Sequence, residues 1–176
     1  MEGAPLPSNT ENFRIRLAQK TGYSNSAIRA AWPEWWSTAA EASPSAAAEL
    51  RFSIARKLGL DPRTLFDDDG PQFMWDDSAK YKNFKGDERE RLALTSFGTS
   101  ISRMLLNGVQ NYAVLQSADA SLLRKLVLSG QKFVRYQDLL ALLWSVGIPV
   151  IHLRVHPLAA KRMCAMAVSI NDRHTI

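Results

Sequence analysis

The chain has 176 residues, 46% of them hydrophobic and 22% charged, so it can bury the core of one domain or of two small ones, and general disorder is excluded. Its formal net charge is +5, which favours an anionic partner without identifying one. Cys164 is the only cysteine, which excludes an intrachain disulfide and favours a reducing, cytoplasmic compartment, and no segment approaches the roughly 20 apolar residues of a membrane helix.

Two short helices separated by a glycine are predicted at the start of the chain. Apolar residues recur at helical spacing from about Thr10 to Thr21, with a cap at Asn9 or Thr10. Gly22 ends this helix, because glycine tolerates a positive φ at a helix C-terminus. Ser24 then caps a second helix from Asn25 to Ala31.

An aromatic cluster and a third helix follow. We expect Trp35 and Trp36 to lie in the core, because aromatic clusters usually bury their area. Ser43 and an early proline begin a helix over 46–58, which Gly59 closes. A short final helical turn is expected at 63–66, and the chain from Asp67 to Gly86 is then interpreted as a linker, within which 73–75 forms a short strand or a docking segment.

The second half changes from helical to strand periodicity. Its three predicted helices cover about 87–106, 119–128 (ended by Gly130) and 136–145. The residues 148–153 and 166–170 then predict β-strands, and Asn171-Asp172 predicts a hairpin turn into a third strand at 174–176. Cys164 is expected to be a small core residue.

The first two helices match the requirements of a helix-turn-helix. That motif needs a small residue where the helices touch, a glycine at the turn and a branched apolar anchor on the second helix. Ala18, Gly22 and Ile28 supply these at separations of four and six residues. Two ordinary packed helices would show the same pattern. The six expected DNA contacts are Asn25, Ser26 and Arg29 on bases and Ser24, Lys20 and Arg14 on phosphate.

The segment LAQKTGYSNSAIRAA resembles the helix-turn-helix of the XRE (lambda-repressor-like) family, and IARKLGLDPRTLFDD resembles that family's closing helices. The resemblance covers about the first 66 residues and implies a five-helix DNA-binding domain. We also expect a homodimer, because one short helix reads few base pairs and two half-sites multiply the specificity. The expected dimer surface lies around Leu92 to Leu106. The chain departs from the family at Trp32 to Ser45, which is longer and more aromatic than the usual loop.

The run LLALLWSVGIPVIHLRVHPLAAKRMCAMAVSINDRHTI resembles the opening of an ImmA/IrrE-type metallopeptidase domain, whose later helix carries a His-Glu-x-x-His motif. The likeness is carried by Trp144 and by the run from Gly147 to Val150. That motif is absent from this sequence, which would then end just before the metal-binding helix. His152 and His156 are four residues apart, but on a strand they would lie roughly 13 Å apart, and no Glu follows His152. We therefore expect surface histidines, no metal, no cofactor, no catalytic residue and no enzyme activity.

Together these features predict a mainly α protein with α+β character at its C-terminal end. The expected domains are a helix-turn-helix domain at 1–66, a linker at 67–86 and, at 87–176, a helical region with C-terminal strands. The leading hypothesis is a cytoplasmic, sequence-specific transcriptional regulator of phage or mobile-element type that binds double-stranded DNA. The alternatives are the N-terminal portion of a DNA-binding regulatory zinc metallopeptidase and an antitoxin-like module whose second half holds a protein partner.

Overall fold

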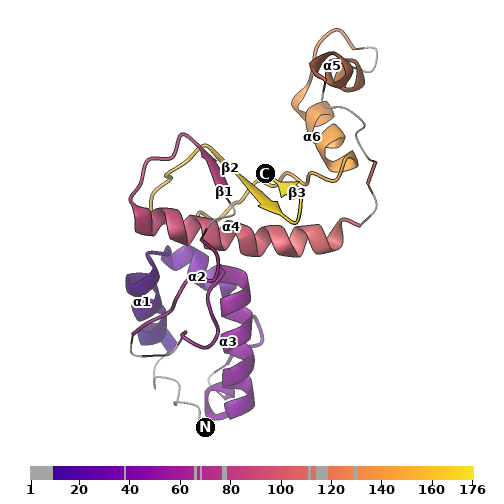
Figure 1. The fold of residues 1–176 in the computed structure, drawn as a ribbon. Coiled ribbons are helices and arrows are strands. Elements are labelled where there is room, and N and C mark those ends of the chain that lie inside the picture. Colours follow the sequence, from indigo (N-terminus) through magenta and orange to yellow (C-terminus); the bar gives the residue numbers. More distant parts are fainter. Residues whose placement is uncertain are drawn as a thin grey trace.

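The chain folds into two layers on opposite sides of one long helix, α4 (Glu88–Gly108) (Figure 1). Three helices pack below α4 and a small sheet lies above it, with a helical hairpin beyond its C-terminal end. This arrangement confirms a mainly α protein with a small β element. The computed structural model describes residues 10–37, 39–65, 67, 69–76, 79–110, 112–113, 119–128 and 131–176.

The helices of the first half begin and end close to the predicted positions. They are α1 (Thr10–Thr21), α2 (Asn25–Ala31), the 3-10 helix η1 (Ala40–Ala42) and α3 (Pro44–Leu58). The predicted turns at Gly22 and Gly59 are confirmed by φ values of +78° and +71°. The caps on Ser24 and Ser43 are confirmed too, since their hydroxyls accept from the backbone of Ala27 and Ala46. The expected cap at Asn9 lies outside the described residues.

The prediction of five helices in this half is wrong for the described residues, which hold three α-helices and one 3-10 helix. Residues 62–65 form turns instead of the short final helix. The carboxylate of Asp61 accepts a hydrogen bond from the backbone of Arg63 at 2.8 Å, which favours a local turn over a helical bond.

Within the described residues, α4 is followed by two further helices, α5 (Ala120–Leu128) and α6 (Tyr136–Ser145). Three strands are also present there, one before α4 and two after α6. The strands are β1 (Ala79–Lys82), β2 (Ala165–Ile170) and β3 (Arg173–Thr175), paired antiparallel in the order β1-β2-β3. Asn171 and Asp172 have φ values of 48° and 59°, as the predicted hairpin turn requires. Gly130, expected to end α5, lies outside the described residues.

The prediction of a strand over 148–153 is wrong. Among the described residues, this segment makes two ladder-like bonds and no regular strand: Ile151 N–H donates to the carbonyl of Ile176 at 2.9 Å, and Ile176 N–H donates to the carbonyl of Pro149 at 3.0 Å. Pro149 has no N–H to donate, which interrupts regular pairing.

Residues of the predicted linker take part in the fold. β1 pairs with β2, placing Tyr81 opposite Met166, and the Tyr81 hydroxyl lies 2.6 Å from that of Thr95 in α4. Phe73 forms a β-bridge with Leu60 and packs against the core. The buried core therefore contains side chains from both sides of the predicted linker, among them Phe13, Leu17, Tyr23, Ile28, Leu50, Ile54, Leu58, Leu60, Leu94, Phe97 and Leu158.

Three expectations about buried surfaces are wrong. Trp35 is 48% exposed and stacks edge-on against Trp36 instead of entering the core. Trp36 is half-buried and packs against the core, in line with the expectation, and Trp32 is buried. Cys164 is exposed rather than a core residue. The expected dimer surface around 92–106 is largely buried, because α3 packs on one side of α4 and the sheet on the other. Among the described residues, no helix has the length and apolar character needed to span a membrane.

Tyr23 joins three elements at the centre of this core. Its side chain is 2% exposed, and its hydroxyl lies 2.6 Å from the carbonyl oxygen of Leu58 and 3.0 Å from that of Ala93. The hydroxyl proton of Tyr23 is thus shared between two carbonyl oxygens, one at the C-terminus of α3 and one in the first turns of α4. Burial, and to a smaller extent the nearby Tyr81 hydroxyl, raise the pKa of Tyr23 well above its ordinary value.

Replacing Tyr23 by Phe should lower the free energy of unfolding by about 1–3 kcal/mol at neutral pH, because two buried carbonyls lose their donor. Because the folded pKa is raised, this contribution is complete below pH about 10 and declines at higher pH at about 1.4 kcal/mol per pH unit, as tyrosine ionises in the unfolded chain. Urea unfolding of both proteins at pH 7 to 11 measures the difference. Tyr136→Phe is the control, since Tyr136 is 70% exposed; an equal effect there would contradict the role of Tyr23.

Small and polar side chains of α4 allow α3 to approach closely. The Ser96 hydroxyl donates to the carbonyl of Gly59, and the Ser100 hydroxyl donates to that of Arg56, so carbonyls that end α3 are satisfied by α4. A Cβ built on Gly59 would lie 2.2 Å from the backbone oxygen of Ser96, whereas one built on Gly22 would have no atom within 4 Å.

Comparing Gly59→Ala with Gly22→Ala should therefore separate two costs: the strain of a side chain at positive φ, and the clash of the new Cβ with a neighbouring backbone. Both residues have positive φ. Gly22→Ala should cost about 1–2 kcal/mol, the cost of a left-handed conformation alone. Gly59→Ala should cost more than about 4 kcal/mol, because two backbones must also separate. Denaturant unfolding measures both, and equal costs would show that the α3–α4 contact is looser than described.

Candidate nucleic-acid interface

α1 and α2 contact each other on either side of the turn at Gly22. Leu17, Ala27 and Ile28 are buried, with Ile28 only 1% exposed, so α2 is anchored to the core along one side. Ala18 is half-buried where the sequence placed the contact between the helices, and its carbonyl accepts from Gly22 N–H at 2.9 Å. The two helices are held in one fixed relation by this packing.

The other side of α2 faces solvent. Asn25, Ser26, Arg29 and Ala30 are all exposed, so the three residues expected to read bases lie together on one short helix. Asparagine and arginine can each make two hydrogen bonds to a base edge. The side chains that could contact a major groove are therefore free of the core.

Of the residues expected to hold phosphate, Lys20 is exposed, whereas Arg14 already contacts other side chains. Lys20 is exposed, and its backbone carbonyl accepts from the guanidinium of Arg89, which places a cation at the C-terminus of α1. The guanidinium of Arg14 lies 4.4 Å from the ring centre of Trp32 and 3.5 Å from the carboxylate of Glu11. Arg14 is therefore already engaged, and a phosphate would have to compete with an intramolecular carboxylate.

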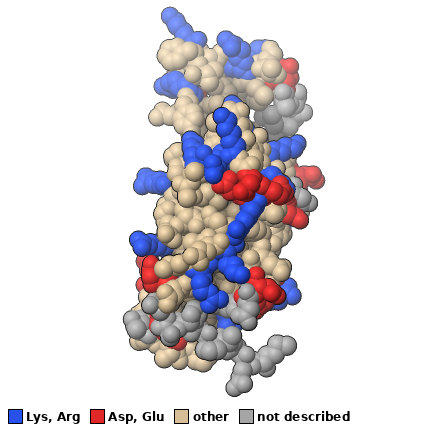
Figure 2. Space-filling view, turned by 90° about the vertical axis from the view of Figure 1, so that its left-hand side faces the viewer, with Lys and Arg blue, Asp and Glu red and all other residues tan. Residues whose placement is uncertain are grey.

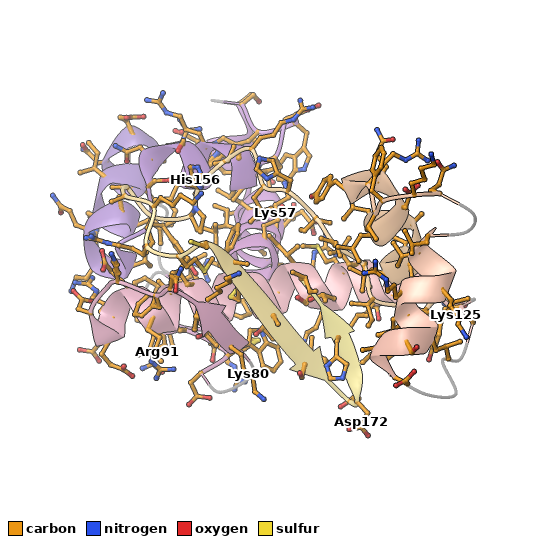
Figure 3. All side chains as sticks on the ribbon, turned by 90° about the horizontal axis from the view of Figure 1, so that it is seen from above. Lys57, Lys80, Arg91, Lys125, His156 and Asp172 are labelled. Carbon is orange, nitrogen blue, oxygen red and sulfur yellow. The ribbon has the colours of Figure 1, made fainter. Side chains whose placement is uncertain are left out.

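Ser24 makes a contact that the sequence did not predict. Its hydroxyl donates to the carbonyl of His156 at 2.7 Å and accepts from Ala27, while its own N–H donates to the carbonyl of Pro157 at 2.7 Å. The adjacent Tyr23 forms a β-bridge with Leu158. We call this set of contacts the Ser24 latch. Figure 3 shows His156 lying over the N-terminal helices.

The latch limits what Ser24 can do. A serine hydroxyl carries one proton, and here it goes to His156, so Ser24 cannot donate to a phosphate without releasing that loop. The partners are 132 residues apart in the chain, and no local pattern signals the contact.

The segment that contains α1 and α2 has an excess of basic residues, as the whole chain does, and this excess favours an anionic partner. Residues 10–31 carry four Lys or Arg and a single Glu. On the face at the left of Figure 1, where α1 lies, Lys and Arg side chains spread over the full height, interrupted by Asp and Glu side chains at mid-height and near the lower end (Figure 2). The basic surface of this face is thus mixed, not a single stripe.

The histidines are placed as surface residues. His152 and His156 are both exposed, in a loop. Within the described part of the chain, no group of three or more His, Cys, Asp or Glu side chains could hold a metal ion.

No family model, curated protein or solved structure matches the chain.

Ser24→Ala tests the latch. Losing the cap should cost about 0.5–2 kcal/mol, and hydrogen exchange of the amide at position 24 should accelerate, because its acceptor Pro157 belongs to the released loop. Ser43→Ala is a matched control, since Ser43 caps α3 in the same way. NMR-detected exchange should show the acceleration only in the first variant; the same rate in both would contradict the latch.

Proposed function

We propose that this protein is a sequence-specific DNA-binding transcriptional regulator that acts in the cytoplasm on double-stranded DNA. The observation that carries the proposal is the α1–Gly22–α2 unit, which buries Ile28 while leaving Asn25, Ser26 and Arg29 exposed on α2. The local excess of basic residues supports it, as does the likeness of residues 17–31 to the XRE (lambda-repressor-like) helix-turn-helix. In this proposal Arg29 and Asn25 read base edges and Lys20 holds phosphate.

A homodimer is part of the proposal. One seven-residue helix reads few base pairs, so useful specificity requires two half-sites and a twofold protein. Because the α4 face is buried, we place the dimer contact on the hairpin of α5 and α6, where a second copy could cover large apolar side chains that are now exposed. These side chains are Leu122, Phe133, Leu139 and Trp144.

Selection of binding sites from random duplex DNA at near-physiological salt tests the function directly. We expect an enriched palindrome with half-sites about one helical turn apart. Binding to the selected site should weaken steeply with salt, because bound phosphates release counterions. Absence of any enriched sequence would overturn the proposal.

Arg29→Ala should weaken binding to the selected site by about 1–3 kcal/mol while the free energy of unfolding changes by less than about 0.5 kcal/mol. Arg63→Ala is the matched control, because it removes the same charge from a side chain that is 89% exposed and lies outside both α2 and the proposed dimer contact. Fluorescence anisotropy with selected and scrambled duplexes measures both. If the two variants lose the same affinity for both duplexes, α2 is not the reading helix.

A further inference from the structure

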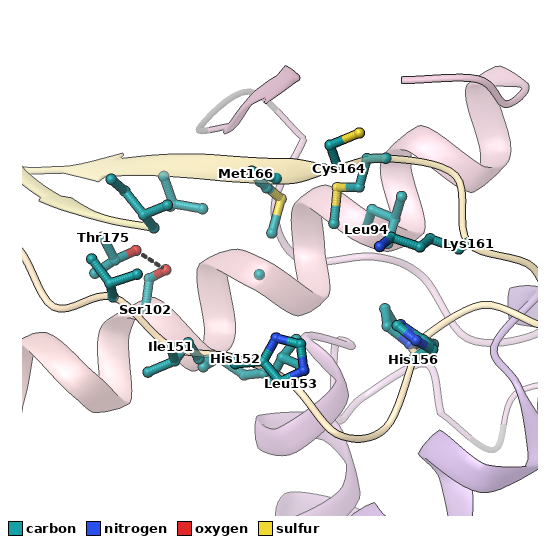
Figure 4. A pocket seen from close by; sticks show the side chains of 18 of the residues that line it. Leu94, Ser102, Ile151, His152, Leu153, His156, Lys161, Cys164, Met166 and Thr175 are labelled. Carbon is teal, nitrogen blue, oxygen red and sulfur yellow. Dashed lines mark hydrogen bonds between the residues drawn. The ribbon is translucent and has the colours of Figure 1, made fainter. Parts of the chain in front are cut away.

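A cavity of about 350 Å³ lies between α4, the strand β2 and the loop 150–163 (Figure 4). His152, Leu153 and His156 come from the loop on one side, and Cys164 and Met166 come from the strand side opposite. This volume is at the lower end of the range for small-molecule sites, about 300–1,000 Å³. The cavity is large enough for a small ligand and lies apart from the exposed face of α2.

The walls of the cavity are mainly hydrocarbon. Leu94, Ile101, Leu105, Ile151, Leu153 and Met166 line it. The polar pair at one end, Ser102 and Thr175, is already satisfied because the two hydroxyls bond to each other. The interior therefore favours an apolar body without requiring polar groups from the ligand.

The charged and titratable side chains at the cavity are cationic or neutral. Lys161 and Arg162 line it together with the rings of His152 and His156, and no Asp or Glu is among the lining residues that the structure describes. Arg162 is engaged by Glu90 at 2.8 Å, whereas Lys161 is exposed. An anionic head group would thus meet attraction from Lys161 and no lining carboxylate.

One wall of the cavity is also the acceptor of the Ser24 latch. His156, Pro157 and Leu158 line the cavity, and the same three residues contact Ser24 and Tyr23 through their backbones. A ligand that contacts this wall changes the free energy of the latched loop relative to the released one. By linkage, the ligand's affinity for the cavity and the stability of the contact with the first turn of α2 are then coupled by one free energy.

We propose that this cavity binds a small carboxylate with an apolar body, and that its occupancy stabilises the Ser24 latch. Resting on the function proposed above, the ligand would be an effector that sets the affinity of α2 for DNA.

Octanoate is the probe for binding, measured by calorimetry on the intact chain without DNA. We expect it to bind and to slow alkylation of Cys164 by iodoacetamide, because Cys164 lines the cavity and is the single cysteine. Octylamine, with the same body and the opposite charge, should bind about ten-fold more weakly. Lys161→Gln should weaken octanoate binding about five-fold, and Lys125→Gln on α5 should leave it unchanged.

Gly98→Ala tests the cavity itself. A Cβ at Gly98 would lie 1.9 Å from the terminal methyl of Met166, so this flexible side chain must move, and both residues line the cavity. The variant should stay folded and bind octanoate about ten-fold more weakly. No octanoate binding to the unmodified protein, or equal binding of octylamine, would overturn the ligand assignment.

The coupling is tested without DNA. Saturating octanoate should slow hydrogen exchange of the Ser24 amide in the unmodified protein, since that amide donates to Pro157 in the cavity wall. An unchanged rate at saturation would overturn the coupling. Failure of the regulator function would appear separately, as no enriched sequence in the DNA selection while octanoate still binds and slows exchange.

Discussion

The hydroxyl of Tyr23 is the contact on which the arrangement of the layers depends. It lies within hydrogen-bonding distance of the carbonyls of Leu58 and Ala93, so it ties the turn before α2 to the end of α3 and the start of α4. Its ring packs at 5.9 Å from that of Phe73 and 6.1 Å from that of Phe97. A buried hydroxyl between two carbonyls is costly to remove, since both the carbonyl of Leu58 and that of Ala93 would lose a hydrogen bond that buried surroundings cannot replace.

α4 joins the helical layer to the sheet, because small polar side chains on its two sides bond to α3 and to β1. Toward α3, Ser96 and Ser100 satisfy terminal carbonyls; toward the sheet, Thr95 meets the hydroxyl of Tyr81. At the C-terminus of α4 the guanidinium of Arg173 donates to the carbonyls of Leu106 and Val109, which places a cation at the negative end of the helix. The helical layer and the sheet are therefore both fixed to one element.

The same architecture connects the two proposals. The loop that follows α6 returns to the beginning of the chain, and its backbone carbonyls accept the hydroxyl and the amide of Ser24. Residues 156–158 of this loop line the cavity, and the same residues contact the chain at the start of α2. A movement of the loop at the cavity would thus reach α2, the helix expected to read DNA, through the hydrogen bonds between the loop and Ser24.

The sequence by itself determined the local elements: the capping serines before α2 and α3, the glycines with positive φ at 22 and 59, and the hairpin turn at 171–172 follow from neighbouring residues. It also predicted which side of α2 is exposed, because helical spacing and one apolar anchor decide that. Only the tertiary structure decided that Trp35 is exposed, that 148–153 is not a strand, and that Ser24 is bonded to His156. Those outcomes depend on partners far away in the chain, and burial and backbone pairing at such distances leave no periodic pattern in the sequence.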